Sequence, residues 1–562
     1  MNVVAEPRRR HLIGTRTTLI DVTFLSVIVW LSLVLYVGGL GLYSDDWGFL
    51  STLHGVSDPN FLSLFKALQA ELSTRPMQAM LLAGLYRWFE LDPLGYHVVN
   101  AVVLTIVGIL VYMTLRELDL PRMISVTVPL VFVLLPHYST DRLWIAAFQA
   151  NLSVGFYFLS LYASLRAIRS GGIAFWAWTI SATVGVLGTV LAYEVVAPLF
   201  LLSVLIVLYR TWQIRVADGE SQRPSWTAPT LVAGLTLLVR GLSVAYKLTT
   251  TDRAGGLGGF GTYLWNIKRT VVGAVSTSYG SYGLALPQKV WLILTEHADT
   301  AILAVGGLLG LLIFGYLYYV LGRTQHTVYD RRRWLAMAVV GVVAFGLGYA
   351  ISLITFDIGF SATGINNRTA IAAAIGVAVS FVAGIGWMSS FVPRIDLRHG
   401  IFCALIAVLC TSGFLVINTI ADYWVTAARR QQAVIASISR LQIPSESVLL
   451  LDGLCSYEGP GIVFETNWDV SGMLQIKFNR SLQGDVIKST TDVREDGVHT
   501  LLYDDVIHVY PFDENLFLYH LESRELYRLR TLDDASRYFE ARDSTTGDPC
   551  ATGSEGQGAS IF

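Results

Sequence analysis

The sequence predicts an all-α transmembrane bundle of about 11 spans, followed by a small extracytoplasmic α/β domain at the C-terminus. Of the 562 residues, 53% are hydrophobic and only 15% are charged, whereas about 25% of the residues of an average soluble domain are charged. Apolar runs of roughly 20 residues, the length that crosses the hydrocarbon core as a helix, recur throughout residues 1–420. Residues 421–562 carry more charge and contain short β-like runs instead. The chain therefore divides into a membrane module and a C-terminal domain that ends in a flexible Gly/Ser tail.

The expected spans come from the apolar runs, and the placement of Lys and Arg orients them. They cover residues 22–42, 96–115, 123–136, 143–165, 173–192, 195–210, 228–247, 300–321, 335–354, 369–389 and 400–420. Residues 76–91 are short for a crossing and carry Arg87, so we expect them in the outer interface. Most arginine clusters between spans then fall on one side, which the positive-inside rule makes the cytoplasm. The N-terminus is then cytoplasmic and the C-terminus extracytoplasmic, in the bacterial inner (plasma) membrane.

Two long outer segments are expected in the membrane module. The first, residues 43–95, contains at 60–68 apolar residues with helical spacing. This spacing is typical of an interfacial amphipathic helix or of a loop helix packed on protein. The second, residues 249–300, is rich in glycine, and its loop at residues 255–261 is expected to be a mobile lid or a flexible connector.

The C-terminal domain is expected to begin with a helical stem at residues 421–441. Strands are expected where β-like runs are separated by Gly, Asp and Asn: residues 447–451, 461–464, 473–478 and 501–510. Cys455 and Cys550 either form a disulfide, which an extracytoplasmic location permits, or are two unrelated thiols.

Several ionisable side chains are expected to meet at the outer face, because each lies near the outer end of a span. They are Asp45, Asp46, His137, Asp141, Glu194 and Arg368. Taken singly, an acid at a helix end is usually a cap or a solvated residue, and an interfacial Arg usually extends its head group to water. Their common location favours a functional site. The net charge of −2 and the lack of a basic tail exclude nucleic acid as a partner.

Four segments in order along the chain resemble one family of membrane enzymes. Asp45-Asp46-Trp47 resembles the acidic first-loop motif of the GT-C superfamily of polytopic glycosyltransferases. Within it, the protein mannosyltransferase-like branch is similar in the following segments: Thr74-Arg75-Pro76, Leu91 to Asn100, Leu135 to Asp141, and Tyr193 to Pro198. Leu91 stands where that branch has a glycine, and Tyr193 where it has a lysine, so a cationic role is not carried over to position 193.

The resemblance implies an inverting glycosyltransferase. Its donor would be a polyprenyl-phosphate sugar held in the membrane, and membrane lipid would be a further partner. The acceptor would be a cell-envelope glycan, a glycolipid or a protein. Asp45 is expected to be the general base that takes the acceptor proton. Arg368, with Arg75 and Lys247 behind it, is expected to bind the donor phosphate, because a guanidinium can bind it bidentately.

The other acids and two aromatic residues have open assignments. Asp46, Asp141 and Glu194 could orient the acceptor or the sugar, or could bind a divalent cation such as Mg²⁺ or Mn²⁺. No obligatory metal is expected, because the first loop lacks the D-x-D spacing of metal-dependent oligosaccharyltransferases. Trp47 could stack on a sugar or belong to the aromatic belt at the interface. His137 could hydrogen-bond phosphate or sugar, or be structural.

Two other functions fit a polytopic chain. A transporter or flippase of lipid-linked sugars would show related halves or helices broken at mid-membrane, whereas these acids lie at span ends and the sequence has no visible internal repeat. A scaffold or receptor acting through its C-terminal domain would leave the outer acids unexplained.

Overall fold

The computed structural model describes residues 15–217, 227–250, 260–297, 299–321, 330–353, 359–478, 481–502 and 505–545. Within these residues, nine helical segments are long and apolar enough to cross a membrane: Arg16–Leu33, Pro93–Glu117, Ile145–Ala167, Gly172–Ala192, Leu199–Val216, Thr300–Tyr319, Arg331–Leu353, Ile365–Ser389 and Ile395–Ile438. Each overlaps an expected span. Two shorter apolar helices, Arg122–Leu134 and Thr230–Val239, lie where the other two spans are expected. The protein is an integral membrane protein with a helical bundle, and the count of 11 spans stays a prediction.

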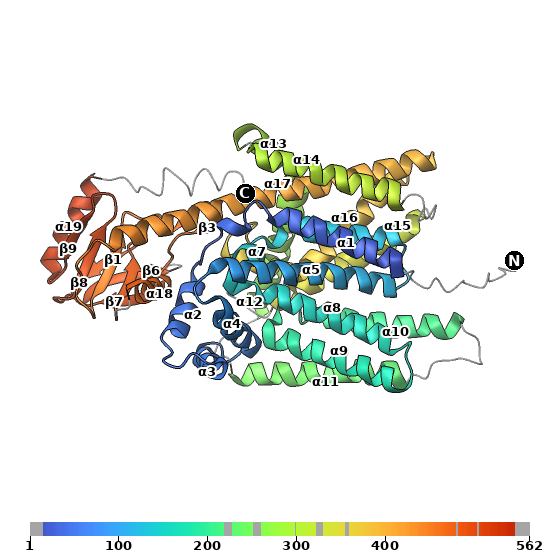
Figure 1. Cartoon of the computed structure of the whole chain (residues 1–562), viewed down its shortest axis with the longest axis horizontal. Coiled ribbons are helices and arrows are strands. Elements are labelled where there is room, and N and C mark those ends of the chain that lie inside the picture. The colour runs from blue at the N-terminus through green and yellow to red at the C-terminus, as the bar shows by residue number, and fades with distance from the viewer. Residues whose placement is uncertain are drawn as a thin grey trace.

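The long helices lie side by side in one bundle (Figure 1). They are α1 (Thr15–Leu33), α5 (Pro93–Glu117), α6 (Arg122–Leu134), α8 (Gln149–Ala167), α9 (Gly172–Ala192), α10 (Leu199–Ala217), α11 (Thr227–Thr250), α14 (Thr300–Gly315), α15 (Arg331–Tyr349), α16 (Ile371–Ser389) and α17 (Ile395–Ile438). A π-helix, η7 (Tyr316–Leu321), extends α14. The start of α1 and the C-terminal domain lie at opposite ends of the bundle (Figure 1).

Small residues let α15 and α16 pack with their backbones almost in contact. A Cβ atom on Gly376 would lie 2.3 Å from the backbone nitrogen of Phe345, and one on Gly348 would lie 2.5 Å from Ala373. Close approach through small residues is a common way to join helices in lipid, where apolar side chains gain little from leaving the bilayer. This pair carries the short segment that contains Arg368.

Short helices gather at the end of the bundle nearest the C-terminal domain (Figure 1). Between α1 and α5 lie η1 (Val37–Gly39), α2 (Asp45–His54), α3 (Phe61–Glu71) and α4 (Pro76–Phe89). Further along the chain, the bundle helices are joined by η2 (Pro136–Tyr138), α7 (Thr140–Leu143), η3 (Ile145–Ala147), η4 (Glu194–Val196), η8 (Ala350–Leu353) and η9 (Ile365–Ala370).

In the first outer segment, α3 and α4 lie beside the bundle end. The side chain of Asn60 caps α3 by accepting a hydrogen bond from the amide of Ser63 at 3.0 Å. α3 buries Leu64 and Leu68 and leaves Phe61 exposed. α4 contacts α3, α5 and α9, so residues 76–91 form a short helix on the bundle end.

The described part of residues 249–300 is mostly helical, whereas most of the glycine-rich loop expected at residues 255–261 lies outside the described residues. It contains α12 (Phe260–Val275), the π-helix η6 (Ser276–Leu284) and α13 (Leu286–Glu296). The glycines are concentrated in residues 255–261, and the residues beyond them are aromatic and apolar with a helical pattern. Residues 251–259 lie outside the described residues.

The C-terminal domain is attached to the bundle by α17, which continues without a break beyond its apolar part (Figure 1). The domain contains β1 (Val448–Asp452), β2 (Tyr457–Glu458), β3 (Gly461–Ile462), α18 (Asn467–Phe478), β4 (Gln483–Val486), β5 (Asp492–Arg494), β6 (Gly497–Leu502), β7 (Asp505–Tyr510), β8 (Leu516–His520), β9 (Glu525–Arg528) and α19 (Leu532–Thr545).

The main sheet has the order β4-β1-β8-β9. β1 runs parallel to β4 and β8, and β8 pairs antiparallel with β9. β5, β6 and β7 form a separate antiparallel sheet. Leu449, Leu450 and Leu451 of β1 are fully buried, as expected for a central strand covered on both faces.

One expected strand, residues 473–478, is the second half of α18. Val470, Met473 and Leu474 are buried, which is the i, i+3, i+4 spacing of one helix face. The side chain of Asp469 accepts hydrogen bonds from the amides of Glu465 and Thr466 at 2.6 and 3.1 Å and fixes the first turn. Residues 473–478 show the alternation of apolar and polar side chains that favours a strand only when they are read without the residues before them.

Candidate active site

The two adjacent carboxylates, Asp45 and Asp46, begin α2 and have different environments. Asp46 is 2% exposed, and its two oxygens accept hydrogen bonds from the amides of Tyr43 at 2.9 Å and Ala146 at 2.7 Å. Burial raises the pKa of Asp46 well above its usual range, although these backbone hydrogen bonds oppose the shift. Asp46 thus joins the first outer segment to the turn before α8. Asp45 is partly exposed.

Asp45 lies in a charged group formed by three outer segments. The guanidinium of Arg75, just before α4, is 3.5 Å from the carboxylate of Glu194 in η4 and lies 4.6 Å from the ring centroid of Tyr193. Burial lowers the pKa of Arg75, but the negative charge of Glu194, the hydrogen bond to Glu194 and the negative charge of Asp45 outweigh burial and raise the pKa. Acid and cation therefore share one partly exposed location at the bundle end.

A second charged group lies around Asp141 in α7. Asp141 is 0% exposed, and within the described residues neither of its carboxylate oxygens accepts a hydrogen bond. Burial raises the pKa of Asp141, and the charges of Arg368 and Arg142 oppose this shift. Buried carboxylates in a protein core nearly always accept hydrogen bonds. A buried carboxylate that lies beside a cation and accepts none is typical of a ligand site.

Asparagines hold the two sides of this second group in place. Asn100 of α5 and Asn151 of α8 both donate to the backbone carbonyl of Asp141, at 2.9 and 2.7 Å. Asn367, next to Arg368, donates to the carbonyl of His137 at 2.9 Å. The segment that carries Arg368 is thus hydrogen-bonded to the loop that carries Asp141.

Trp144 connects the two charged groups. Its indole nitrogen donates to the carbonyl of Tyr43 at 2.9 Å, two residues before Asp45. The guanidinium of Arg368 lies 5.3 Å from the centroid of the Trp144 ring, within the range of a cation–π contact. Asp45 and Arg368, 323 positions apart in the sequence, are therefore linked through Tyr43 and Trp144 at the same end of the bundle.

The Tyr-His-x-x-Asn run at the start of α5 positions the outer segments. Tyr96 donates from its hydroxyl to the carbonyl of Glu90 at 2.7 Å. His97 donates through Nε2 to the carbonyl of Gly41 at 3.0 Å, and Asn100 holds Asp141 as described. Three side chains of one helix end thus fix three separate loops.

The aromatic candidates are both buried. His137 is 2% exposed and donates to the carbonyl of Ser278 at 2.9 Å, and burial lowers its pKa to about 4. Trp47 is 2% exposed, with the Lys477 ammonium of α18 at 5.9 Å from its ring centroid. Contact of either residue with a sugar stays a prediction. Lys247 belongs to α11, but its side chain lies outside the described residues.

The three acids named as possible metal ligands are separated. In the part of the chain that the structure describes, no group of three or more His, Cys, Asp and Glu side chains is arranged to hold a metal ion. Both oxygens of Asp46 are used by backbone amides, while Asp141 and Glu194 face different arginines. Metal dependence stays a question for experiment.

Sequence reasoning missed Asn151 and Trp144. Asn151 lies in an expected membrane span and is 0% exposed. A buried amide inside a membrane helix needs a specific partner, so it was a usable signal. Trp144 carries no such signal, because tryptophan is common near membrane interfaces.

The chain has no match among protein-family models or among curated proteins. ArnT from Cupriavidus metallidurans bound to undecaprenyl phosphate is similar in structure, with 12% identity, a TM-score of 0.37 and coverage of 85% of this chain and 87% of ArnT. The apo state of ArnT gives the same identity and coverage and a TM-score of 0.38. The oligosaccharyltransferase of Archaeoglobus fulgidus, tethered to an acceptor peptide, has 12% identity, a TM-score of 0.36 and coverage of 84% of this chain and 64% of that protein.

Proposed function

We propose that this chain is an inverting glycosyltransferase that moves a sugar from a polyprenyl-phosphate donor to an extracytoplasmic acceptor. The acceptor is a cell-envelope glycan, a glycolipid or a protein. One observation carries the proposal. The charged group of Asp45 and Arg75 and the charged group of Asp141 and Arg368 lie at the same end of the bundle, and Trp144 connects them. The motif resemblance along residues 20–215 supports it independently of this geometry.

Asp45 takes the role of general base. It is the partly exposed member of the acidic pair, whereas Asp46 is occupied by two backbone amides. A base must reach the acceptor hydroxyl while the hydroxyl oxygen attacks the anomeric carbon. The proton goes to the Asp45 carboxylate as the bond between the anomeric carbon and the phosphate oxygen breaks, so the anomeric configuration inverts.

Arg368 takes the role of phosphate ligand. The leaving polyprenyl phosphate keeps its negative charge in a region of low dielectric constant, where a fixed guanidinium stabilises it strongly. Asn367 anchors this segment to the Asp141 loop, which fixes the position of the neighbouring Arg368. Arg75 is a second candidate, and Glu194 restrains its guanidinium.

The site is assigned to the extracytoplasmic side of the inner membrane. The opposite end of the bundle carries Arg116 and Arg166 in the last turns of α5 and α8, and Arg169 in the short connection after α8, where the positive-inside rule counts them. Cys455 in the C-terminal domain is disulfide-bonded, which favours an oxidising compartment; Cys550 lies outside the described residues.

The test is a transfer assay with purified protein and a set of polyprenyl-phosphate sugars, comparing wild type with Asp45→Asn. Asparagine keeps the shape but cannot accept the proton, so turnover should fall by about 10²- to 10⁴-fold with an unchanged thermal midpoint. Asp58→Asn, an exposed acid in the same outer segment, is the matched control and should retain full turnover. Equal turnover in wild type and Asp45→Asn would show that Asp45 is not the general base. Repeating the assay with EDTA, Mg²⁺ or Mn²⁺ tests whether the enzyme depends on a metal.

A further inference from the structure

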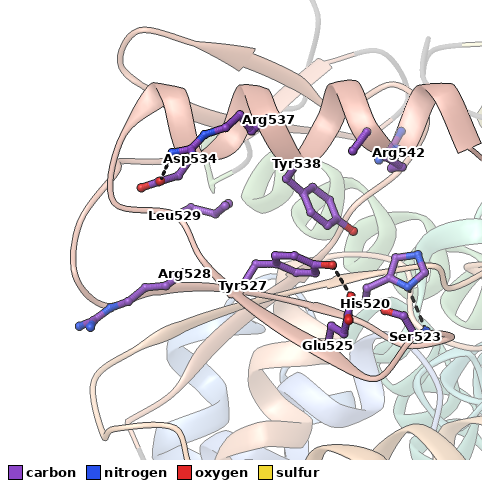
Figure 2. A pocket seen from close by; sticks show the side chains of 11 residues that line it. His520, Ser523, Glu525, Tyr527, Arg528, Leu529, Asp534, Arg537, Tyr538 and Arg542 are labelled. Atoms are coloured by element: carbon purple, nitrogen blue, oxygen red, sulfur yellow. Dashed lines mark hydrogen bonds and ion pairs between the residues drawn. The ribbon is translucent and has the colours of Figure 1, made fainter.

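The C-terminal domain contains a pocket far along the chain from the candidate active site. It lies between the β8–β9 hairpin and α19 (Figure 2) and has a volume of about 440 Å³, within the roughly 300–1,000 Å³ of typical ligand sites. Tyr527 of β9 and Tyr538 of α19 form an aromatic wall, with ring centroids 4.7 Å apart and ring planes inclined by 59°. Tyr527 is 36% exposed, so its ring is accessible from outside.

The three arginines that line the pocket already have acidic partners: Arg528 pairs with Glu514 at 3.4 Å, Arg537 with Asp534 at 3.0 Å, and Arg542 with Asp452 at 3.5 Å. A phosphate or a carboxylate ligand would have to compete with these partners. A neutral ligand would not.

Hydrogen-bonding groups surround the aromatic wall. Figure 2 shows His520, Ser523 and Glu525 grouped beside Tyr527. The carboxylate of Glu525 accepts from the Tyr527 hydroxyl and has further lone pairs for other donors. Apolar ring faces bordered by a carboxylate, a hydroxyl and an imidazole suit a ligand with a C–H face and a rim of hydroxyls, which describes a neutral sugar.

The position of the pocket sets the size of that ligand. α18 packs on α2 at the bundle end, where a Cβ atom on Gly472 would lie 2.5 Å from the Trp47 carbonyl oxygen. α18 also packs against β4, which is one edge of the main sheet, whereas β9 is the other edge. Three strand spacings, about 14 Å, separate the two edges, and α19 lies on the side of the domain away from the bundle (Figure 1). A single sugar cannot reach both places, but a glycan chain can.

We propose that this pocket binds an internal stretch of a neutral glycan acceptor whose end receives the new sugar at the candidate active site. This inference rests on the proposed glycosyltransferase function and narrows its acceptor to a polysaccharide. The binding is non-covalent and uses the Tyr527 ring and the hydrogen-bonding group at Glu525.

The test uses the full-length protein in lipid nanodiscs on an array of neutral and acidic oligosaccharides of four to eight sugars. Neutral oligosaccharides should bind, and Tyr527→Ala should weaken binding at least tenfold, with Glu525→Gln weakening it less. Arg494→Ala, which breaks an exposed ion pair on another sheet of the same domain, is the matched control and should bind as wild type does. The inference is overturned if only acidic oligosaccharides bind, if none binds, or if Tyr527→Ala binds them equally well.

A second measurement separates this inference from the proposed function. Asp45→Asn should bind the oligosaccharides normally but transfer sugar about 10²- to 10⁴-fold more slowly. Tyr527→Ala should raise KM for a long acceptor and leave a disaccharide acceptor unaffected. Glycan binding without any transfer by the wild type would contradict the proposed function alone. Transfer with the same KM for long acceptors in wild type and Tyr527→Ala would contradict the pocket's role alone.

Discussion

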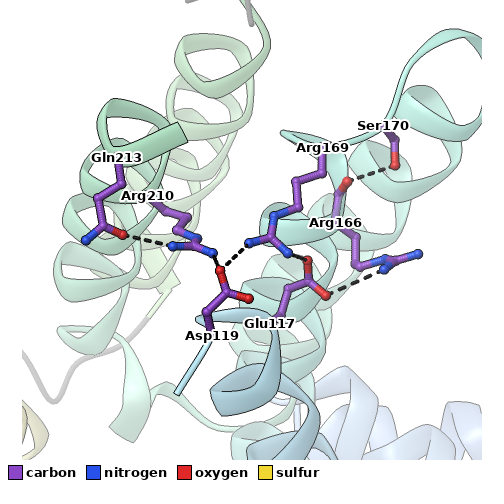
Figure 3. Close-up of polar contacts among 7 residues, drawn as sticks. All are labelled: Glu117, Asp119, Arg166, Arg169, Ser170, Arg210 and Gln213. Carbon is purple, nitrogen blue, oxygen red and sulfur yellow. Dashed lines mark hydrogen bonds and ion pairs between the residues drawn. The ribbon is translucent and has the colours of Figure 1, made fainter. Parts of the chain in front are cut away.

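The two ends of the helical bundle hold their charged side chains in different ways. At the end away from the C-terminal domain, Glu117 lies 2.7 Å from Arg169 and 3.5 Å from Arg166, and Asp119 pairs with Arg169 and Arg210 (Figure 3). Each of these acids thus contacts two arginines directly.

At the candidate active site, the buried carboxylate of Asp141 accepts no hydrogen bond from the described residues. The two ends are about 25 Å apart along α5, from Asn100 to Glu117. One end thus uses ion pairs to join helices, whereas the other keeps a buried acid without a hydrogen-bond donor, as functional sites commonly do at some expense in stability.

The largest effect, on turnover, is expected from Arg368→Lys at the candidate active site. Lysine keeps the charge but cannot bind a phosphate bidentately, so turnover should fall about 100-fold, or about 2.7 kcal/mol of transition-state stabilisation, with little change in thermal midpoint. Arg166→Lys at the other end is the control and should keep turnover within about twofold. Wild-type turnover in Arg368→Lys would remove Arg368 from the phosphate site.

A smaller effect, on stability and not on turnover, is expected from Glu117→Gln. The Glu117 side chain is 4% exposed and its partners Arg166 and Arg169 are 42% and 33% exposed, so solvent screens part of the interaction. The free energy of unfolding should fall by about 1–2 kcal/mol, measured as a lower thermal midpoint in detergent. Glu296→Gln, on the exposed face of α13, should cause no loss. Unchanged stability in Glu117→Gln would show that the ion pairs at this end of the bundle do not stabilise the packing of the helices.

The smallest effect is a pH dependence at Asp141. Burial raises its pKa in the folded protein, so above pH 4 the folded state keeps a proton that the unfolded state has lost, and the free energy of unfolding falls as pH rises. Asparagine does not titrate, so the thermal midpoint of Asp141→Asn should rise relative to wild type between pH 4 and pH 8.

Asp46→Asn provides the contrast for this experiment. An asparagine there has one acceptor oxygen for the two backbone amides that Asp46 now satisfies, so at pH 4 it should destabilise the protein by about 1–3 kcal/mol. Because burial raises the pKa of Asp46 as well, this loss should shrink as the pH rises. A constant difference between Asp141→Asn and wild type over this pH range would mean that Asp141 is not held in a desolvated site.

Much of the membrane module could be predicted from the sequence, because the length and apolar content of a span are strong signals. Nine expected spans overlap helices that meet both criteria. Residues 260–296 could not be assigned, because the glycines at 255–261 suggested a loop and the amphipathic pattern that follows them is short. The start of α18 was missed because its helix face becomes clear only when Val470 is read together with Met473.

The sequence predicts which side chains lie near the span ends at one face, and their roles in a site stay predictions. The sequence cannot tell which of two adjacent carboxylates is buried. That is decided by the amide of Ala146, 100 positions away, which takes one oxygen of Asp46. The connection through Trp144 could not be predicted from the sequence either, because it depends on how the loop before α8 packs against the first outer segment.

The unbroken course of α17 makes the membrane module and the C-terminal domain one mechanical unit. Its 44 residues span about 66 Å, roughly twice the thickness of the hydrocarbon core. One residue inserted between the apolar part and the domain would turn the domain by about 100° around the helix axis, taking α18 away from α2. The angular register of one helix thereby decides whether the C-terminal domain can contact the membrane module through α18 and α2 at all.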